Sequence, residues 1–530
     1  MKRASEKPAL VIAFMLFFVA CQAPVNEKNK PVKDTHWLEE MTISDLQKGY
    51  TDGKFTISDV VKAYLDRIES IDNNGPSLNS IILINPDALH IAEELDRELA
   101  AGKKRGPLHG VPVILKDNID THDKMPATAG SLALKDSYPK QDSFVAKKLR
   151  EAGAVILGKA NLSEWANFRA EMSSSGWSGV GGQTRNPYVL DRNPCGSSSG
   201  SGVAVSANLC MFAIGTETNG SIVCPSNNNG IVGIKPTVGL ISRSGIVPIS
   251  FTQDTPGPMC RTVEDAATSL GLMTGVDEAD STTLESVRHA EKDYTRFLDA
   301  GSLKGKRIGL LKKSMGFSDK VDTLMYEAVK FMKSAGAEIV EVEFPKGENY
   351  EQASLNVMLY EFKDGLNKYL AGTEENVKVR SLKDLIAFDK SDSTEMRYFD
   401  QKILERAEKK GSLDEKEYKE ALAKMLKATR TEGIDKLMNT NRLDALISPT
   451  GSPAWKTDLL LGDHFTGGDS SPAAISGYPA ITLPMGFVDD LPVGITFFGR
   501  AWSEGTLIGL AYSYEQGTKH RKMPRFLVSD

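Results

Sequence analysis

The feature that most constrains the fold is the alternation of helical and strand patterns from about His36 onward. Asp142 is expected to cap a helix that ends at Gly153, and the short apolar run 154–157 then predicts a buried strand. The alternation recurs as strand, helix and strand at 307–311, 320–334 and 339–342. It predicts one large α/β domain over residues 36–530, with a central mixed, mostly parallel sheet covered by helices on both faces.

The most charged part of the chain, residues 373–440, predicts consecutive amphipathic helices with a break at 409–412. Its charges are expected on solvated helix faces. Because this segment lies between two apolar parts of the chain, it could also cap an active site. Length alone favours about three domains of ~150 residues each. No linker rich in Pro, Gly or Ser separates such domains, so we predict a single one.

The first twenty residues have the pattern of an export signal. A basic start precedes the apolar run 9–20, which is shorter than the roughly 20 residues of a membrane-spanning helix. The run ends at Ala20 before Cys21, which resembles a bacterial lipoprotein signal that is cleaved before a lipid-bearing cysteine. We therefore expect a signal over 1–20, lipidation at Cys21, a polar tether over 21–35 and a lipid-anchored position in the cell envelope, on a periplasmic or surface face. An ordinary cleaved signal is the alternative.

Charge and metal-ligand spacing exclude two classes of function. The formal net charge of −6 gives no electrostatic footprint for nucleic acid, which a basic domain would provide. Seven histidines and five cysteines contain no Cys-x-x-Cys or His-Glu-x-x-His spacing, so no zinc site is predicted.

Four cysteines remain after the signal, namely Cys195, Cys210, Cys224 and Cys260. An exported protein could pair them, but their connectivity does not follow from spacing. A fold of about 500 residues buries enough surface to be stable without disulfide bonds. Buried free thiols are therefore the prediction.

Two motif matches are rejected on their context. The run from Gly153 to Lys159 imitates a phosphate-binding loop, but Ala160 lacks the hydroxyl that would hold Mg²⁺. The run 196–200 formally satisfies G-x-S-x-G, the motif of the nucleophile elbow in α/β-hydrolases. However, turn residues rather than a strand precede Ser198, and none of the later histidines lies in a segment that marks it as catalytic. Neither a nucleotide site nor a hydrolase elbow is predicted.

A lysine and several serines remain as candidates for chemistry. Lys116 ends an apolar strand pattern, and taken alone it would be a solvent-facing strand end. A lysine after six mostly apolar residues could instead be partly buried, where desolvation would lower its pKa from ~10.4 and permit it to act as a base. Three consecutive serines, 197–199, lie in a glycine-rich loop that small residues follow. Ser221 comes 24 residues after Ser197.

Three segments carry a family resemblance: GVPVILKDN around Lys116, CGSSSGSG around Ser197 and TETNGSIVCP around Ser221. In order and spacing they resemble the amidase signature family, as do SGYPAITLP and LPVGI near the C-terminus. The resemblance covers about residues 38–520 and implies an amidase-signature domain. Within the family the chain is most similar to bacterial peptide amidases, which hydrolyse C-terminal peptide amides.

The resemblance implies a Ser–cis-Ser–Lys triad and no metal or organic cofactor. Ser221 would be the nucleophile, Ser197 the bridging serine after a cis peptide bond from Gly196, and Lys116 the base. Ser198 would support the site by hydrogen bonding. An oxyanion hole would be formed by the backbone N–H groups of Thr218, Asn219, Gly220 and Ser221.

The sequence departs from the family pattern at three positions. The family usually has Gly where Asn219 and Cys195 stand, and often Arg where Val223 stands. The Asn219 side chain is tolerable if it points outward, where it could shape the leaving-group pocket. None of these departures touches the proposed triad.

The leading hypothesis is therefore an amidase that releases ammonia from a small-molecule or peptide carboxamide, with C-terminal peptide amides as substrates. It needs no nucleic acid, and it contacts the membrane only through its lipid. A glutamyl-tRNA amidotransferase A-type subunit is an alternative, but such a subunit needs cytoplasmic partners, which the export signal argues against. A catalytically inactive binding lipoprotein is the third hypothesis, and retention of all three triad residues argues against it.

Overall fold

The computed structural model describes residues 35–345 and 350–529, and the chain from Thr35 onward forms one compact unit. The predicted signal 1–20, Cys21 and the tether up to residue 34 lie outside the described residues. Within the described ranges, no helix has the length and apolar character needed to cross a bilayer.

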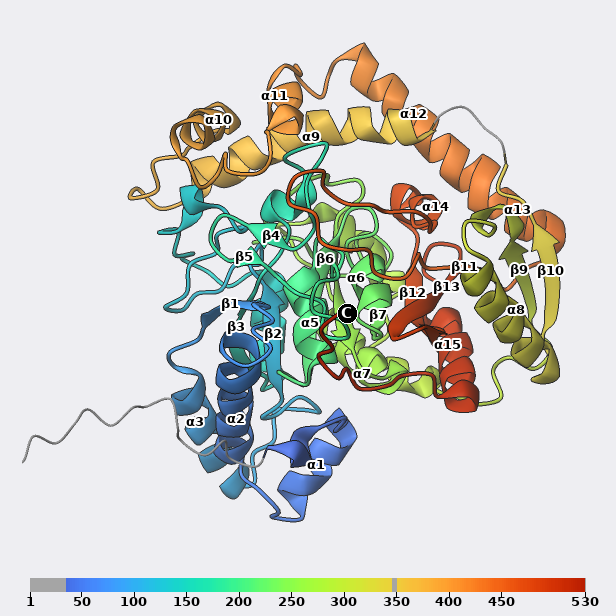
Figure 1. Cartoon of the computed structure of the whole chain (residues 1–530), viewed down its shortest axis with the longest axis horizontal. Helices are drawn as coiled ribbons and strands as arrows, with labels where there is room; N and C mark the ends of the chain where they lie inside the picture. Colours follow the sequence, from blue (N-terminus) through green and yellow to red (C-terminus); the bar gives the residue numbers. More distant parts are fainter. Residues whose placement is uncertain (1–34, 346–349, 530) are drawn as a thin grey trace, which may run out of the picture. The chain divides into compact units, whose positions relative to one another are not determined.

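One sheet of eleven strands runs through this unit (Figure 1). In spatial order its strands are β1 (Ile81–Ile84), β3 (Val155–Ala160), β2 (Pro112–Lys116), β6 (Phe212–Glu217), β8 (Thr255–Cys260), β7 (Val232–Lys235), β12 (Ala480–Val488), β13 (Leu491–Phe498), β11 (Ala445–Pro449), β9 (Arg307–Leu311) and β10 (Glu338–Val342). Parallel pairing joins β3, β2 and β6, and again β11, β9 and β10. The other neighbours pair antiparallel. The predicted α/β domain with one mixed sheet is confirmed.

The α-helices are distributed along the whole described chain. They are α1 (Ile43–Thr51), α2 (Ile57–Arg67), α3 (Ala88–Ala100), α4 (Phe144–Glu151), α5 (Ser199–Ser206), α6 (Val223–Asn228), α7 (Val263–Met273), α8 (Asp319–Ser334), α9 (Tyr350–Gly372), α10 (Leu382–Ser391), α11 (Lys402–Glu408), α12 (Lys416–Thr429), α13 (Asp435–Asn441), α14 (Ser471–Ser476) and α15 (Glu504–Thr518). A separate short hairpin joins β4 (Trp177–Ser178) to β5 (Gly182–Gln183).

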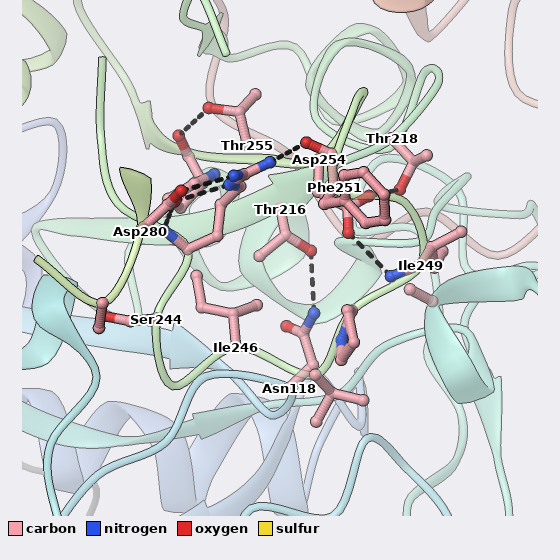
Figure 2. Close-up of a pocket in the computed structure, with 16 residues that line it drawn as sticks. Asn118, Thr216, Thr218, Ser244, Ile246, Ile249, Phe251, Asp254, Thr255 and Asp280 are labelled. Carbon is pink, nitrogen blue, oxygen red and sulfur yellow. Dashed lines mark hydrogen bonds and ion pairs between the residues drawn. The ribbon is translucent and has the colours of Figure 1, made fainter. Parts of the chain in front are cut away.

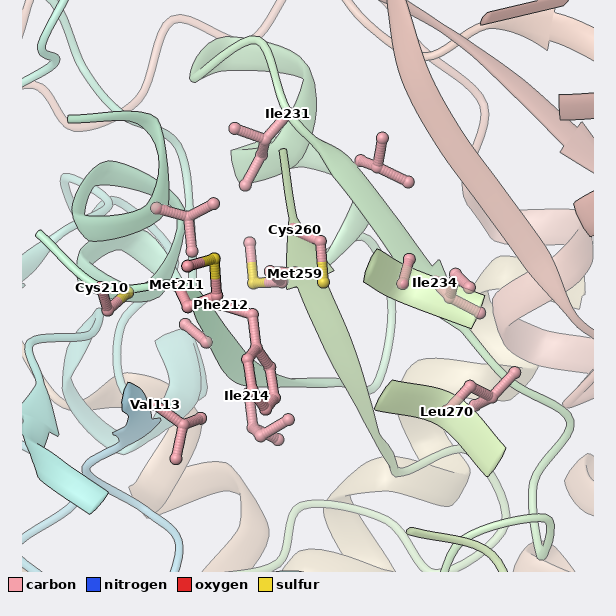
Figure 3. Close-up of a cluster of buried hydrophobic side chains, with 14 of the residues drawn as sticks. Val113, Cys210, Met211, Phe212, Ile214, Ile231, Ile234, Met259, Cys260 and Leu270 are labelled. Carbon is pink, nitrogen blue, oxygen red and sulfur yellow. The ribbon is translucent and has the colours of Figure 1, made fainter. Parts of the chain in front are cut away.

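The central strands are covered on both faces. Every residue of β2, β3, β6 and β8 is buried, although successive residues of a strand point to opposite faces. Helix α5 packs on β2, β3, β6 and β8, α7 packs on β8 and β7, and α15 packs on β12 and β13. Figure 3 shows part of this core, with Phe212 and Ile214 of β6 near Met259 of β8.

The local predictions hold with small shifts of boundary. The helix before the strand 155–160 begins after Ser143, whose hydroxyl accepts the Ala146 N–H at 3.2 Å. The prediction of Asp142 as its cap is wrong, because that carboxylate accepts the His122 N–H and the Arg150 Nε–H instead. Strand β9 has the predicted bounds, and α8 and β10 each begin one residue earlier than predicted.

The charged segment 373–440 folds as the predicted series of helices, α10 to α13, with a break between α11 and α12. Helices α10, α11 and α12 pack on α9, and Figure 1 shows them following one another along this long helix. Helix α9 precedes the predicted segment and, as described below, is the helix that supports the wall of the active-site pocket.

Candidate active site

Lys116 lies at the end of β2, between β3 and β6, and its side chain is completely buried. Its Nζ donates to Ser197 Oγ at 2.7 Å, to Thr216 Oγ1 at 2.9 Å and to the Thr216 carbonyl at 3.2 Å. Burial lowers the pKa of Lys116 to about 7, although the nearby carboxylates of Asp254 and Glu217 pull it upward. A lysine in this state can accept a proton near neutral pH.

The serine loop before α5 presents Ser197 to this lysine. A cis peptide bond joins Gly196 to Ser197, as the family resemblance predicts. The Ser197 carbonyl accepts the Ser163 N–H at 3.1 Å, which fixes the loop to the segment after β3. The Ser198 hydroxyl donates to the Thr216 carbonyl at 3.1 Å and accepts the Thr216 N–H at 3.2 Å. Ser198 is therefore committed to β6, the strand next to Lys116, and it is not an exposed elbow nucleophile.

Ser221 lies in the short turn between β6 and α6, and its exposed fraction is 9%. The buried carboxylate of Glu217 folds this turn. It accepts the N–H groups of Gly220 at 2.9 Å, Ile222 at 2.7 Å and Val223 at 3.0 Å. The turn around Ser221 is thus held from inside by one side chain.

This arrangement changes the predicted oxyanion hole. The Gly220 N–H donates to Glu217 and is therefore not available to a substrate in this structure, so its prediction as a donor is corrected. The N–H groups of Thr218, Asn219 and Ser221 remain as the candidate donors. The physical reason is that a carboxylate four residues before Ser221 folds back onto the start of α6, where N–H groups are unpaired.

The side chain of Asn219 points toward the start of α14. Its Oδ1 accepts the Ser470 hydroxyl at 2.7 Å, and its Nδ2 donates to Ser471 Oγ at 3.2 Å. The Ser198 N–H donates to the Ser221 carbonyl at 3.2 Å, so the two serine loops are joined by a backbone hydrogen bond. Asn219 therefore ties the Ser221 turn to α14.

Two residues of the site, Thr216 and Glu217, were not among those predicted from the sequence. Thr216 accepts hydrogen bonds from Lys116, Ser198 and Asn118, so it connects three side chains of the site. Glu217 follows it and organises the Ser221 turn. The signal was the position of both residues at the end of the apolar run that leads to Ser221.

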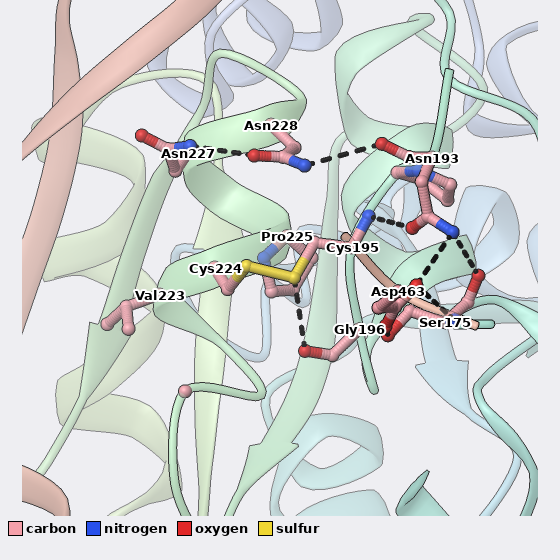
Figure 4. The surroundings of a disulfide bond; sticks show 12 residues. Ser175, Asn193, Cys195, Gly196, Val223, Cys224, Pro225, Asn227, Asn228 and Asp463 are labelled. Atoms are coloured by element: carbon pink, nitrogen blue, oxygen red, sulfur yellow. Dashed lines mark hydrogen bonds between the residues drawn. A yellow bond between two sulfur atoms is a disulfide. The ribbon is translucent and has the colours of Figure 1, made fainter. Parts of the chain in front are cut away.

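The prediction of free thiols is wrong for Cys195 and Cys224, which form a disulfide bond (Figure 4). Cys195 lies two residues before Ser197, and Cys224 lies three residues after Ser221. The bond therefore joins the two serine loops covalently, and Trp455 clusters with it. A domain of this length does not need a disulfide for its overall stability. That does not exclude a disulfide that links two particular loops, as this one does. Cys210 and Cys260 are free and buried, as predicted (Figure 3).

A pocket of about 200 Å³ adjoins these residues (Figure 2). Asn118, Thr216 and Thr218 form the side next to the lysine and serines, and the loop from 243 to 256 forms most of the rest. The Thr218 hydroxyl donates to Asp254 Oδ1 at 2.5 Å. Thr216 thus both lines the pocket and accepts a hydrogen bond from Lys116.

Helix α9 supports the wall of this pocket. Its buried Glu361 accepts the hydroxyls of Ser250 at 2.5 Å and Thr252 at 3.0 Å. Its Ser354 hydroxyl donates to Gln253 Oε1 at 2.7 Å. The helix that supports the site is therefore α9, which lies just before the segment 373–440 that the sequence suggested as a cap.

A buried lysine hydrogen-bonded to a serine, next to a second serine in a tightly held turn, defines a site suited to acyl transfer from amides or esters. A family model described as Amidase matches residues 59–508. The chain belongs to the amidase signature family and is an amide-hydrolysing enzyme.

Particular relatives agree with this assignment. The chain is similar to the native peptide amidase from Stenotrophomonas maltophilia, with 48% sequence identity, a TM-score of 0.89 and coverage of 92% of this chain and 99% of that chain. A probable amidase of Arabidopsis thaliana is 42% identical over 506 residues, 94% of each chain. The A-type subunit of the glutamyl-tRNA(Gln) amidotransferase of Clostridium botulinum is 35% identical over 488 residues, which cover 88% of this chain and 95% of that protein.

Proposed function

We propose that this enzyme hydrolyses the C-terminal amide of peptides to a carboxylate and ammonia, through Ser221, Ser197 and Lys116. The observation that carries the proposal is the 2.7 Å hydrogen bond between Lys116 Nζ and Ser197 Oγ, made by a lysine whose pKa is lowered to about 7. A neutral lysine at this distance can take the hydroxyl proton of Ser197.

In the proposed first half-reaction, Ser221 Oγ attacks the amide carbonyl carbon. Its proton passes to Ser197 Oγ as the Ser197 proton passes to neutral Lys116. The tetrahedral intermediate carries a negative oxygen, which accepts hydrogen bonds from N–H groups of Thr218, Asn219 and Ser221. Each such donor typically contributes about 3 kcal/mol to transition-state stabilisation.

Collapse of the intermediate breaks the C–N bond and leaves Ser221 acylated. The proton on Lys116 returns through Ser197 to the departing nitrogen, so that ammonia leaves as a neutral molecule. A water molecule then repeats the sequence on the acyl-enzyme, which releases the carboxylic acid and restores Ser221. The acid ionises in solution, where ammonia takes up its proton. No proton is gained or lost by the enzyme over the cycle.

The peptide-amide substrate is supported by similarity to the peptide amidase from Stenotrophomonas maltophilia, which extends over 92% of this chain. The test is to incubate the enzyme with a C-terminally amidated peptide and follow ammonia and the amide-to-acid mass change. We expect conversion by the wild type and none by Ser221→Ala. Ser334→Ala, on the exposed face of α8, is the matched control and should retain full activity.

Absence of conversion, with Ser221 still labelled by a serine-directed acylating probe, would contradict the peptide substrate and keep the chemistry. Absence of both conversion and labelling would contradict the triad and favour a binding protein. These two outcomes distinguish a failure of the peptide-amide substrate from a failure of the proposed serine chemistry.

Amidation of glutamyl-tRNA is the second candidate, favoured by the 35% identity to the A-type component of a glutamyl-tRNA(Gln) amidotransferase. It predicts that ammonia release from glutamine is coupled to amidation of misacylated tRNA in the presence of the other components. Hydrolysis of a peptide amide by this chain alone, without such coupling, would argue against it.

We further propose that the chain is exported and carries a lipid on Cys21, in a cell-envelope location. The basic start, the short apolar run and Ala20 before Cys21 support this. The test is incorporation of an alkyne-labelled fatty acid during bacterial expression. Label and membrane association are expected for the wild type and should be lost in Cys21→Ser, whereas equal behaviour of the two would contradict the anchor.

A further inference from the structure

The pocket beside Thr216 and Thr218 has an apolar interior (Figure 2). Half of the sixteen residues that line it are apolar, and the larger of these are Ile246, Val247, Pro248, Ile249, Phe251 and Pro256. Phe251 is 38% exposed, so this large apolar side chain at the pocket wall is only partly buried. A partly exposed aromatic ring at the wall of a pocket is a typical ligand contact.

Two charged groups of the pocket, Arg243 and Asp280, are already paired with each other. Arg243 donates to both oxygens of Asp280, at 2.8 and 2.6 Å, and also to the Phe251 carbonyl. These contacts leave the guanidinium neutralised and fixed against the loop that it supports. It is therefore not a free cation for a substrate carboxylate.

Asp254 is likewise occupied on both of its oxygens. Oδ1 accepts the Thr218 hydroxyl, and Oδ2 accepts the N–H groups of Ile249 at 2.8 Å and Ser250 at 2.9 Å. These bonds hold the apolar wall in place and attach it to the segment that leads to Ser221. A ligand consequently meets mainly the apolar side chains of the pocket.

The size of the pocket suits one side chain. An apolar cavity of about 150 Å³ can hold a benzene ring, whereas whole drug-sized ligands occupy about 300–1,000 Å³. The volume here, about 200 Å³, lies just above the first value. The wall is also preformed, because Val247 N–H donates to the Asn118 carbonyl at 2.9 Å and Glu361 holds Ser250.

We propose that this pocket is the subsite for the side chain of the substrate residue that carries the scissile amide, and that it takes an apolar, preferably aromatic, side chain. The proposal rests on the proposed amidase function and deepens it. Thr216, which bonds Lys116, and Thr218, three residues before Ser221, place the pocket beside the reacting carbonyl.

The experiment compares N-acetyl amino-acid amides that differ only in the side chain: Phe, Leu, Ala, Lys and Asp. We expect kcat/KM to be higher for the Phe and Leu amides than for the Ala amide by at least about ten-fold, the discrimination that added apolar groups give in a pocket. The Asp amide should be the poorest substrate. A preference for the Lys amide would overturn the proposal and indicate pairing with Asp254.

Two variants change the pocket at exposed positions. Phe251→Ala removes the partly exposed ring and should lower kcat/KM for the Phe amide about ten-fold while leaving the Ala amide within about two-fold. Ala279→Trp adds bulk at the edge of the pocket and should disfavour the Phe amide in the same way. Tyr326→Ala, which removes an exposed ring on α8, is the control and should leave the Phe-to-Ala ratio unchanged.

The outcomes separate this proposal from the amidase function. Hydrolysis of every amide with equal kcat/KM, unaffected by either variant, would overturn the pocket and leave the amidase function standing. If no amide is hydrolysed, binding of N-acetyl-phenylalaninamide to the enzyme is measured by calorimetry. Binding that Phe251→Ala weakens would then support the subsite, and absence of binding would overturn it.

Discussion

Two completely buried lysines lie on neighbouring strands of the sheet, Lys116 on β2 and Lys159 on β3. In the parallel register Leu115 pairs with Lys159 and Lys116 pairs with Ala160. Because side chains alternate along a strand, the two lysines point to opposite faces of the sheet. Burial lowers the pKa of both ammonium groups.

What differs is the partner of each ammonium group. Lys116 Nζ contacts the hydroxyl of Ser197, which can give up a proton, whereas Lys159 Nζ donates to the Ile119 carbonyl, which cannot. The carboxylates of Asp117 and Asp120 also act on Lys159. Burial thus lets a lysine act as a base near neutral pH. Whether it can take up a proton there depends on whether its neighbour is a proton donor such as a hydroxyl.

The largest expected effect is that of Lys116→Met. It removes the proposed base and should lower kcat by about 10⁴-fold or more, the scale of losing an essential member of a catalytic group. Lys159→Met is the matched substitution and should keep kcat within about ten-fold in the folded enzyme. The assay is ammonia release with circular dichroism to confirm folding, and an equal loss in both variants would break the comparison.

Ser197→Ala should have the next largest effect on activity. It leaves Lys116 without a hydroxyl to relay the proton of Ser221, and the loss of such a proton transfer typically costs about 10²–10⁴-fold. The pH-dependence of the residual activity should also change, because Lys116 no longer acts through a serine. Activity close to that of the wild type would show that Lys116 does not need Ser197.

The pH profile gives a smaller and more specific effect. The lysine must be neutral to accept a proton, and its pKa in the folded enzyme is about 7. We therefore expect kcat/KM to rise about ten-fold per pH unit below 7 and to level off above it. Lys159→Met should keep the same midpoint of the pH profile. A shifted midpoint in that variant would show that the titration belongs to Lys159 and not to Lys116.

The smallest expected effect on activity comes from reduction of the Cys195–Cys224 disulfide. Opening a cross-link across about 29 residues should lower the free energy of unfolding by about 3 kcal/mol. A several-fold loss of activity should accompany it, because the bond joins the loops of Ser197 and Ser221. Thermal unfolding and ammonia release with and without a phosphine reductant measure both effects.

The double variant Cys195→Ser/Cys224→Ser is the control for this measurement and should be insensitive to the reductant. Equal sensitivity of wild type and double variant would assign the effect to another part of the chain. Reduction should not disturb the surroundings of Lys159. Its hydrogen bond to the Ile119 carbonyl joins β3 to the neighbouring segment and does not involve the disulfide.

Local patterns along the chain were sufficient to predict the elements that carry the site. The apolar run that ends at Lys116 predicted a strand and offered a partly buried lysine as one of two alternatives, and the helix and strand periods predicted β9, α8 and β10 to within one residue. The three segments around Lys116, Ser197 and Ser221 indicated the family. These features depend on neighbouring residues, so the sequence by itself determined them.

Only the tertiary structure decided which of these groups meet. Lys116 and Ser197 are 81 residues apart in sequence, and Asn219 and Ser470 are 251 apart. The commitment of the Gly220 N–H to Glu217 depends on how the Ser221 turn folds back on itself, and the Cys195–Cys224 bond depends on how close two loops come. Periodicity and propensity act over a few residues, whereas hydrogen bonds and disulfides between distant segments form only where the packed sheet and helices bring them together.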